Sequence, residues 1–473
     1  MKRVVVVGGG VSGLSAARAI LDEGERQSIE IELTLVEREP YLGGKIRSTR
    51  EEGYLCEAGP PGFLDNKPST LALARRLEIE PRLLKSNDNA RKRYIFTGGA
   101  LKLLPEDPAS FLLSDLISIR GKLRLAVELL LPQGDPSEDE SVSAFVRRRL
   151  GDEALEKLID PMSAGIYAGD PSVMSLRSSF PRIFQIEQQF GGLLKGMLGL
   201  QKMAKARGQQ GPKTAGPGGV LWSFRDGAAE LTDRLASSLG DQRIRAGAGV
   251  SALERGQEGW RVRLPGGEID RADAVVVATP AYDAAALLGP SDQTLADLLH
   301  AIPYVPAAVV CMGYRVQDMP RPADGFGFLI PKAEGRKILG SRWDSSTFAD
   351  RAPDGTALLT QIVGGARNPE LVGLGDGELL AVMRDEMKIT MGIEAPPAYT
   401  KIVRWPRAIP QYVVGHEARM RQTEARIAAL GGVFLGGNAY YGIGINDCTT
   451  HAGVLAPRVA QFLGGAPAGG SRP

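Results

Sequence analysis

A run of four valines that leads directly into a cluster of glycines is the feature that most constrains the fold of this chain. The run Val4–Val7 is continuously apolar, as in a parallel strand buried on both faces of a sheet. The segment Gly8–Gly13 follows at once with the pattern G-x-G-x-x-G, and residues 14–21 then place small and apolar side chains at helical spacing. A strand, a glycine turn and a helix in this order predict a doubly wound α/β domain that binds a dinucleotide.

Each glycine of the motif has a separate expected task. Gly8 allows the tight turn, Gly10 lets backbone N–H groups approach a pyrophosphate at the helix N-terminus, and Gly13 lets the helix pack closely on the strand. A second expected strand, Ile29–Val36, ends at Glu37, whose carboxylate is placed to accept hydrogen bonds from a ribose diol. A chance glycine cluster and a solvated carboxylate are the alternatives. The order of the parts favours the nucleotide site.

A second glycine-rich element indicates which dinucleotide is bound. Gly43 and Gly44 follow the ribose acid closely, and Glu57–Pro60 comes soon after. Two consecutive glycines here would let the chain fold back over the diphosphate, as in flavoproteins that bind FAD in an extended form. Simple surface turns are the alternative interpretation.

Later segments complete the expected FAD domain. Ala272–Pro280 is a further buried strand, and Ala248–Val250 precedes it. Val433–Asn438 is another apolar run that ends in glycines, and Tyr441–Asp447 then opens a helix. The N-terminus of that helix would favour negative charge on a reduced flavin ring. The sequence thus predicts one Rossmann-like FAD domain assembled from discontinuous segments.

Composition excludes several other kinds of chemistry. The 473 residues carry a net charge of +2, which argues against nucleic acid as a partner. The three cysteines and three histidines are scattered without the spacing of a zinc site or a redox dithiol, so we expect no metal site and a reducing compartment. No second G-x-G-x-x-G motif follows a strand, so a separate NAD(P)H domain is not expected. Reduced flavin would then pass electrons to oxygen, a quinone or another protein, which favours an oxidase.

Motifs in the middle and late parts of the chain point to a family. They are Gly165–Asp170, Ser179–Pro181, Gly325–Pro331, Ile409–Tyr412 and Gly444–Cys448. With these segments in order over essentially its whole length, the chain resembles the oxygen-dependent protoporphyrinogen oxidases, which are amine-oxidase-like flavoproteins.

The resemblance implies an α/β fold in three parts. Residues 1–85, 216–290 and 405–473 would form the FAD domain, and residues 291–404 a substrate domain with a mixed sheet. Residues 86–215 would form a helical domain that associates with a membrane.

The resemblance also implies the residues of the site. The residues expected around FAD are Gly8, Gly9, Gly10, Val11, Ser12, Gly13, Glu37, Arg38, Gly44, Lys45, Gly59, Pro60, Pro61, Gly62, Val250, Asn438, Ile443, Gly444 and Ile445. The residues expected around the substrate are Arg93, Gly165, Gly169, Gly327, Leu329, Leu339 and Ile362. Arg93 would pair with a propionate, and the aliphatic residues would clamp the macrocycle. Pro60 or Pro61 stands where relatives often carry Arg or Asn, so any role of a polar side chain there is absent.

The implied activity is the six-electron oxidation of protoporphyrinogen IX to protoporphyrin IX in heme biosynthesis. Hydride would leave a methylene bridge for FAD, and molecular oxygen would reoxidise the flavin and give hydrogen peroxide. No catalytic side chain is assigned, because the flavin carries the chemistry. Coproporphyrinogen III is the alternative substrate, but its extra propionates would need more cations than Arg93 alone beside an aliphatic wall. A flavin amine oxidase, with Tyr440 and Tyr441 in an aromatic cage, and a non-catalytic flavin-bound adaptor remain as rival functions.

Two stretches bear on location. Ser110–Leu131 interleaves large apolar residues with basic ones, as a membrane-surface helix pair does, and burial against the substrate domain is the alternative. Gln188–Arg225 has basic but no acidic residues and would attract anionic lipid or an anionic tetrapyrrole, unless it is simply a loop. With no secretory signal at the start, we expect a cytoplasmic protein, peripheral to the membrane if these stretches bind lipid. Homodimerisation is left open.

Overall fold

The valine run forms the central strand of a five-stranded parallel sheet in the computed structural model, which describes residues 1–206, 219–265 and 269–464. Strand β1 (Lys2–Val7) lies between β2 (Ile31–Val36) and β14 (Ala274–Val277). The edges are β10 (Ile244–Arg245) and β20 (Val433–Leu435), and every pair is parallel. Segments from both ends and the middle of the chain therefore build one sheet, as predicted.

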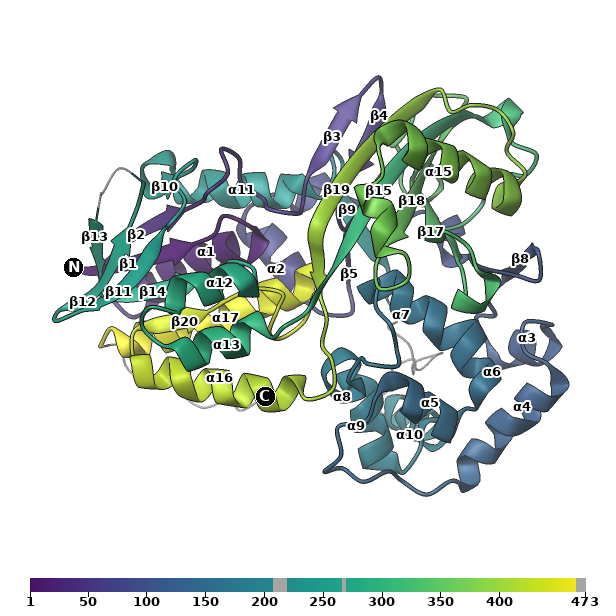
Figure 1. The fold of residues 1–473 in the computed structure, drawn as a ribbon, viewed down its shortest axis with the longest axis horizontal. Helices are drawn as coiled ribbons and strands as arrows, with labels where there is room; N and C mark the ends of the chain where they lie inside the picture. Colours follow the sequence, from purple (N-terminus) through teal and green to yellow (C-terminus); the bar gives the residue numbers. More distant parts are fainter. Residues whose placement is uncertain (207–218, 266–268, 465–473) are drawn as a thin grey trace.

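Alternate valines of β1 enter two different hydrophobic cores. Val4 and Val6 pack with α1 (Val11–Arg26), α11 (Ala229–Leu239) and α17 (Ile445–Phe462) on one face. Helices α1 and α17, from opposite ends of the chain, lie side by side (Figure 1). Because successive side chains of a strand point to opposite faces, a continuously apolar strand needs cover on both.

The second core lies on the other face of the same sheet. Val5 and Val7 pack there with α12 (Ala281–Leu288), α13 (Gln293–His300) and a three-stranded antiparallel sheet. The strands of this small sheet are β11 (Ala252–Gly256), β12 (Gly259–Arg263) and β13 (Ile269–Ala272).

A seven-stranded mixed sheet forms the second large layer. Its order is β19-β15-β18-β17-β16-β7-β8, and all neighbours are antiparallel except β16 and β7. Helix α15 (Asp376–Met391) covers one face through Leu379, Met383 and Met387. The strands are β7 (Arg93–Thr97), β8 (Ala100–Leu103), β15 (Tyr304–Arg315), β16 (Gly327–Leu329), β17 (Ile338–Trp343), β18 (Thr356–Gly364) and β19 (Tyr399–Pro410).

Helices gather in the third part of the molecule, at the lower right of Figure 1. They include α3 (Pro108–Leu113), α4 (Ile119–Ala126), α5 (Val142–Arg149), α7 (Asp160–Tyr167), α9 (Pro181–Phe190) and α10 (Leu193–Ala206). No helix within the described ranges has both the length and the apolar character needed to cross a membrane.

The sheets place domain boundaries differently from the sequence. Strands β7 and β8 fall in the segment predicted as helical, yet they pair into the mixed sheet. Helix α13 falls in the predicted substrate segment, yet it packs into the second core of the FAD-type domain. Strand β19 stays in the mixed sheet as far as Pro410. We therefore propose that the substrate domain consists of residues 93–103 and 304–410, because strand pairing defines it better than motif position does.

Candidate functional site

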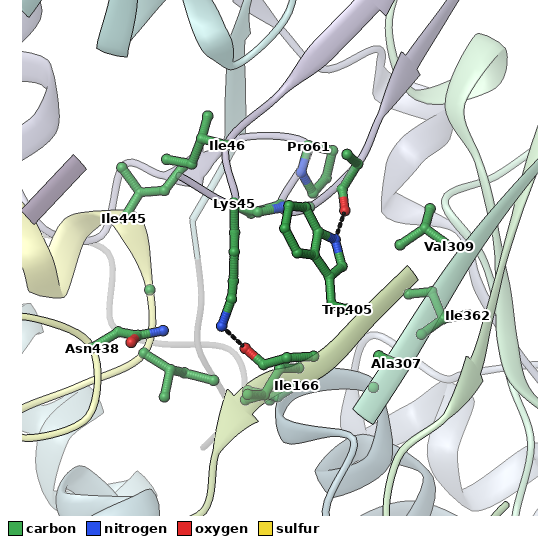
Figure 2. A pocket seen from close by; sticks show the side chains of 18 of the residues that line it. Lys45, Ile46, Pro61, Ile166, Ala307, Val309, Ile362, Trp405, Asn438 and Ile445 are labelled. Carbon is green, nitrogen blue, oxygen red and sulfur yellow. Dashed lines mark hydrogen bonds between the residues drawn. The ribbon is translucent and has the colours of Figure 1, made fainter. Parts of the chain in front are cut away.

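A single large cavity of about 1920 Å³ is lined by residues from all three parts of the molecule. Small-molecule sites usually enclose about 300–1,000 Å³. The cavity therefore has room for a dinucleotide together with a second ligand. Figure 2 shows part of its wall, with Lys45 and Asn438 on one side and Ile362 and Val309 on the other.

The glycine turn at the start of α1 forms one end of this cavity. Gly8 has φ +110°, a left-handed conformation that favours glycine, and its N–H donates to the carbonyl of Val36 at 2.8 Å. A Cβ on Gly13 would lie 1.9 Å from the carbonyl oxygen of Gly8, so only glycine lets helix and turn pack. A Cβ on Gly10 would meet nothing nearer than the Cα of Gly44 at 4.0 Å. Packing within the protein therefore does not require glycine at position 10, and the space where a side chain would stand is open.

No side chain caps the N-terminus of α1, where Gly10 is the N-cap residue. The first backbone N–H groups of a helix lack partners within it, and together they attract anions. Gly10, Val11 and Ser12 all line the cavity, so these donors are available to a pyrophosphate.

Glu37 at the end of β2 is held by the backbone. One carboxylate oxygen accepts a hydrogen bond from the N–H of Gly9 at 2.6 Å, and the other accepts from the N–H of Glu39 at 2.8 Å. Each oxygen keeps a further lone pair, and the side chain lines the cavity. This geometry suits acceptance of hydroxyl donors such as a ribose diol.

The second glycine pair folds the chain back over the first glycine turn, and its predicted position over a diphosphate stays a prediction. Gly43 has φ +97° and Gly44 φ +59°, and the N–H of Gly43 donates to the carbonyl of Gly9 at 2.8 Å. The next residue, Lys45, extends into the cavity in Figure 2. Its ammonium group donates to the carbonyl of Arg407 at 2.9 Å and to that of Ala408, and burial lowers the pKa of Lys45 to about 8.

The segment before α17 also reaches the cavity. Asn438 and residues 443–445 line it. The carboxylate of Asp447, in the first turn of α17, accepts a hydrogen bond from the N–H of Gly444 at 3.0 Å and pairs with Lys67. The ammonium group of Lys67 compensates the carboxylate charge at this helix terminus, and stabilisation of a reduced flavin there stays a prediction.

The structure brings most of the expected site residues to this one cavity. The predicted cofactor residues that line it are Gly8, Gly10, Val11, Ser12, Glu37, Arg38, Gly44, Lys45, Gly59, Pro60, Pro61, Val250, Asn438, Ile443, Gly444 and Ile445. The predicted substrate residues that line it are Arg93, Gly165, Gly327, Leu329, Leu339 and Ile362.

Four expected residues are absent from the lining. Gly9 supports the first glycine turn through its hydrogen bonds with Glu37 and Gly43, and Gly13 supports it through its close approach to Gly8. A Cβ on Gly62 would lie 2.0 Å from the carbonyl oxygen of Trp222, so this glycine serves packing. A Cβ on Gly169 would lie 2.4 Å from the Oε1 of Gln411, so this glycine also serves packing.

The expected substrate wall is apolar and closely packed. A Cβ on Gly165 of α7 would lie 2.7 Å from a methyl carbon of Leu329, so helix backbone and leucine side chain are in contact. Arg93 stands at the rim, with its guanidinium 5.7 Å from the ring centroid of Phe326. Desolvation by the surrounding protein lowers the pKa of this guanidinium.

Several lining residues were missed by sequence reasoning. Ala307 and Val309 of β15 face the cavity at alternate positions, and Trp405 of β19 joins them (Figure 2). The indole N–H of Trp405 donates to the carbonyl of Ala58 at 2.7 Å. Alternation along a strand is the signal that could have found the first two. The basic residues Arg91 and Arg182 also line the cavity, and no sequence motif marked them.

These residues fit a flavin dinucleotide. The open position beside Gly10 and the uncapped helix N-terminus suit the pyrophosphate, and the Glu37 carboxylate suits the ribose. The residues expected to hold FAD and those expected to hold the substrate share one continuous cavity, which redox chemistry between two ligands requires.

Comparisons with known proteins agree with this assignment. The family model "Flavin containing amine oxidoreductase" matches residues 11–457. The chain is 32% identical to a coproporphyrinogen III oxidase of Bacillus subtilis (strain 168), and the alignment covers 94% of this chain and 95% of that one. It is also 32% identical to the chloroplastic protoporphyrinogen oxidase 1 of Arabidopsis thaliana, over 97% of this chain and 88% of the relative.

A solved structure extends the likeness to three dimensions. The putative protoporphyrinogen oxidase from Exiguobacterium sp. 255-15 superimposes with a TM-score of 0.82 at 28% identity, and covers 97% of this chain and 99% of its own. The expected flavin cofactor and fold class are thereby confirmed: the protein is an FAD-dependent oxidoreductase. The chain belongs to the flavin containing amine oxidoreductase family.

Proposed function

We propose that the protein oxidises a porphyrinogen to a porphyrin in heme biosynthesis, with protoporphyrinogen IX as the substrate and molecular oxygen as the electron acceptor. The observation that carries the proposal is the aliphatic wall of Leu329, Leu339 and Ile362, which faces Gly165 and has Arg93 at its rim. A porphyrinogen is an apolar macrocycle with carboxylates at its edge, so it needs such walls and a cation at the rim. The names of the relatives support the same substrate class.

The protein's own contribution is to bind and orient the substrate. FAD, when bound, supplies the hydride acceptor and the route of electrons to oxygen, which yields hydrogen peroxide. The aliphatic residues keep water from the macrocycle, and Arg93 fixes its orientation through a propionate. No side chain is assigned as a base, because the flavin carries the chemistry.

Coproporphyrinogen III is a second candidate, favoured by the cations that sequence reasoning missed. Arg91 and Arg182 line the cavity in addition to Arg93. Arg182 stands in the first turn of α9, where a positive charge opposes the helix dipole, and it has no ion pair within the described part of the chain. An additional substrate carboxylate would compensate that charge.

The test compares kcat/KM for the two porphyrinogens in wild type, Arg93→Ala and Arg182→Ala. With protoporphyrinogen IX as the substrate, we expect Arg93→Ala to lower kcat/KM about tenfold or more, as loss of one charge-assisted contact does, and Arg182→Ala to have little effect. A wild-type preference for coproporphyrinogen III that Arg182→Ala abolishes would replace protoporphyrinogen IX in the proposal. Turnover of neither porphyrinogen would refute it.

The amine-oxidase alternative has less support. Tyr440 and Tyr441 are not among the residues that line the cavity. Tyr440 is buried, and Tyr441 stacks on His451 with ring centroids 4.4 Å apart. An aromatic cage around an amine would need both rings at the cavity. Oxidation of a polyamine or an aromatic amine at a rate comparable to porphyrinogen would revive this function.

We also propose that the protein is cytoplasmic and binds a membrane surface through α3 and α4. Leu113 and Ile119 are 89% and 77% exposed, and Leu112 and Leu123 are exposed beside them. Large apolar patches on a soluble surface mark interaction sites. The basic Gln188–Arg225 stretch would add charge attraction, although its residues 207–218 lie outside the described ranges.

Liposome sedimentation tests this proposal: Leu113→Ser/Ile119→Ser should reduce binding, and undiminished binding would contradict it. Homodimerisation remains a separate proposal for light scattering to test.

A further inference from the structure

We propose that the buried ion pair between Asp160 and Arg367 is a positioning device that sets the geometry of the substrate wall. This inference rests on the proposed function. Asp160 begins α7, and Arg367 follows the end of β18. A guanidinium N–H of Arg367 donates to the Asp160 carboxylate at 2.7 Å, and the two side chains are only 8% and 10% exposed. Neither residue lines the cavity, so any effect on the substrate is transmitted through other residues.

The pair binds a third segment as well. The backbone N–H of Lys332 donates to the same carboxylate oxygen of Asp160 at 2.8 Å. A second N–H group of Arg367 donates to the carbonyl of Ile330 at 2.6 Å. One ion pair therefore joins α7, the end of β18 and the chain just past β16.

Each of these three elements supplies at least one of the residues expected around the substrate. Helix α7 carries Gly165, β16 carries Leu329 and β18 carries Ile362. Gly165 and Leu329 are already in contact, since a Cβ added to Gly165 would lie only 2.7 Å from the leucine side chain. A small movement of α7 would thus shift Leu329, and with it the apolar wall of the cavity against which we place the macrocycle.

The far end of α7 is held by a backbone contact to the residue before Arg367. The N–H of Ala366 donates to the carbonyl of Ala168 at 2.8 Å. That contact is between backbone groups and survives side-chain substitution. Loss of the ion pair should therefore loosen the Asp160 end of α7 without releasing the whole helix.

The chain offers a matched control at nearly the same place. The ammonium group of Lys332 pairs with Asp170 at 3.4 Å, which links the segment after α7 to the chain past β16. The lysine side chain is 64% exposed. Exposed ion pairs of this kind contribute little to stability, so removing this one should leave the geometry of the substrate wall unchanged.

The experiment measures Asp160→Asn, Arg367→Gln, the double variant and the control Asp170→Asn. For each we determine FAD content, kcat and KM for protoporphyrinogen IX, and the dissociation constant of protoporphyrin IX by fluorescence. In the single variants we expect KM and the dissociation constant to rise about tenfold, because the wall no longer positions the bound substrate. We expect kcat to stay within about threefold of wild type and the FAD content to be full. The double variant should be no worse than either single variant, because both changes remove one interaction.

The double variant also guards against misfolding, since it leaves no unpaired buried charge. The proposal is overturned if KM and the dissociation constant stay within twofold of wild type, if Asp170→Asn raises them equally, or if kcat alone falls. A wild-type protein that neither oxidises porphyrinogen nor binds porphyrin would instead refute the proposed function, and this inference with it.

Discussion

At the scale of single residues, two glycines of one motif should respond differently to substitution by alanine. A Cβ on Gly10 has open space around it, whereas a Cβ on Gly13 would lie 1.9 Å from the carbonyl oxygen of Gly8. Gly10→Ala should therefore fold normally but bind FAD about 10–100-fold more weakly, because the methyl group blocks charge-assisted contacts with the pyrophosphate. Gly13→Ala should lower the melting temperature of the apoprotein itself. Flavin retention and thermal unfolding measure the two effects, and full flavin retention by Gly10→Ala would refute the placement of the pyrophosphate.

A buried carboxyl group predicts a pH dependence of stability. Glu57 is nearly fully buried; it accepts hydrogen bonds from the hydroxyl of Ser48 at 2.6 Å and the N–H of Ala228 at 2.9 Å. Desolvation raises the pKa of Glu57 from 4.5 to about 7. Its stabilising contribution is therefore complete below pH 4.5 and is lost as the pH rises through about 7.

The near-isosteric variant Glu57→Gln should not lose stability in this range. Between pH 5 and pH 8 its free energy of unfolding should improve relative to wild type by about 2–3 kcal/mol, since one pKa unit corresponds to about 1.4 kcal/mol. Denaturant unfolding at the two pH values measures the difference. A constant difference across the range would show that Glu57 titrates normally.

At the scale of elements, buried ion pairs of Arg149 with Glu128 and Glu187 hold the helical part together. Arg149 of α5 and Glu128 of η3 (Val127–Leu130) are both 0% exposed, and the carboxylate also accepts from the N–H of Leu193 at the start of α10. Glu128→Ala should reduce the free energy of unfolding by about 3 kcal/mol, because the buried guanidinium of Arg149 loses its nearer carboxylate and keeps only that of Glu187, 3.5 Å from its Nε. The more exposed pair Arg148–Glu140 is the control, and Glu140→Ala should cost at most about 1 kcal/mol. Equal losses in thermal unfolding would contradict this account.

Elements differ in how well the sequence predicts them. Local rules were enough for β1, the glycine turn, α1 and Glu37, because these parts meet through neighbouring chain segments and standard turn geometry. Strands β7 and β8 were missed, since their partner β16 lies far along the chain and only tertiary pairing reveals it. The same reason applies to Arg182 and to the Asp160–Arg367 pair, whose roles come from a cavity and a contact that no local pattern encodes.

At the scale of the whole molecule, the arrangement of sheets predicts the electron acceptor. Within the described residues the five-stranded sheet is the only one built entirely of parallel strands, and its G-x-G-x-x-G turn opens into the large cavity. A nicotinamide dinucleotide would need a second such unit, because its pyrophosphate also binds at a glycine turn and a helix N-terminus. We therefore expect turnover with oxygen as the only electron acceptor. Three molecules of oxygen should be consumed and three of hydrogen peroxide formed per porphyrin, because the reaction consists of three two-electron oxidations. An oxygen electrode, a peroxide assay and porphyrin fluorescence together measure this ratio, and added NADPH should not change the rate. A strict requirement for NADPH, or porphyrin formation without oxygen uptake, would show that electrons leave the flavin by another route.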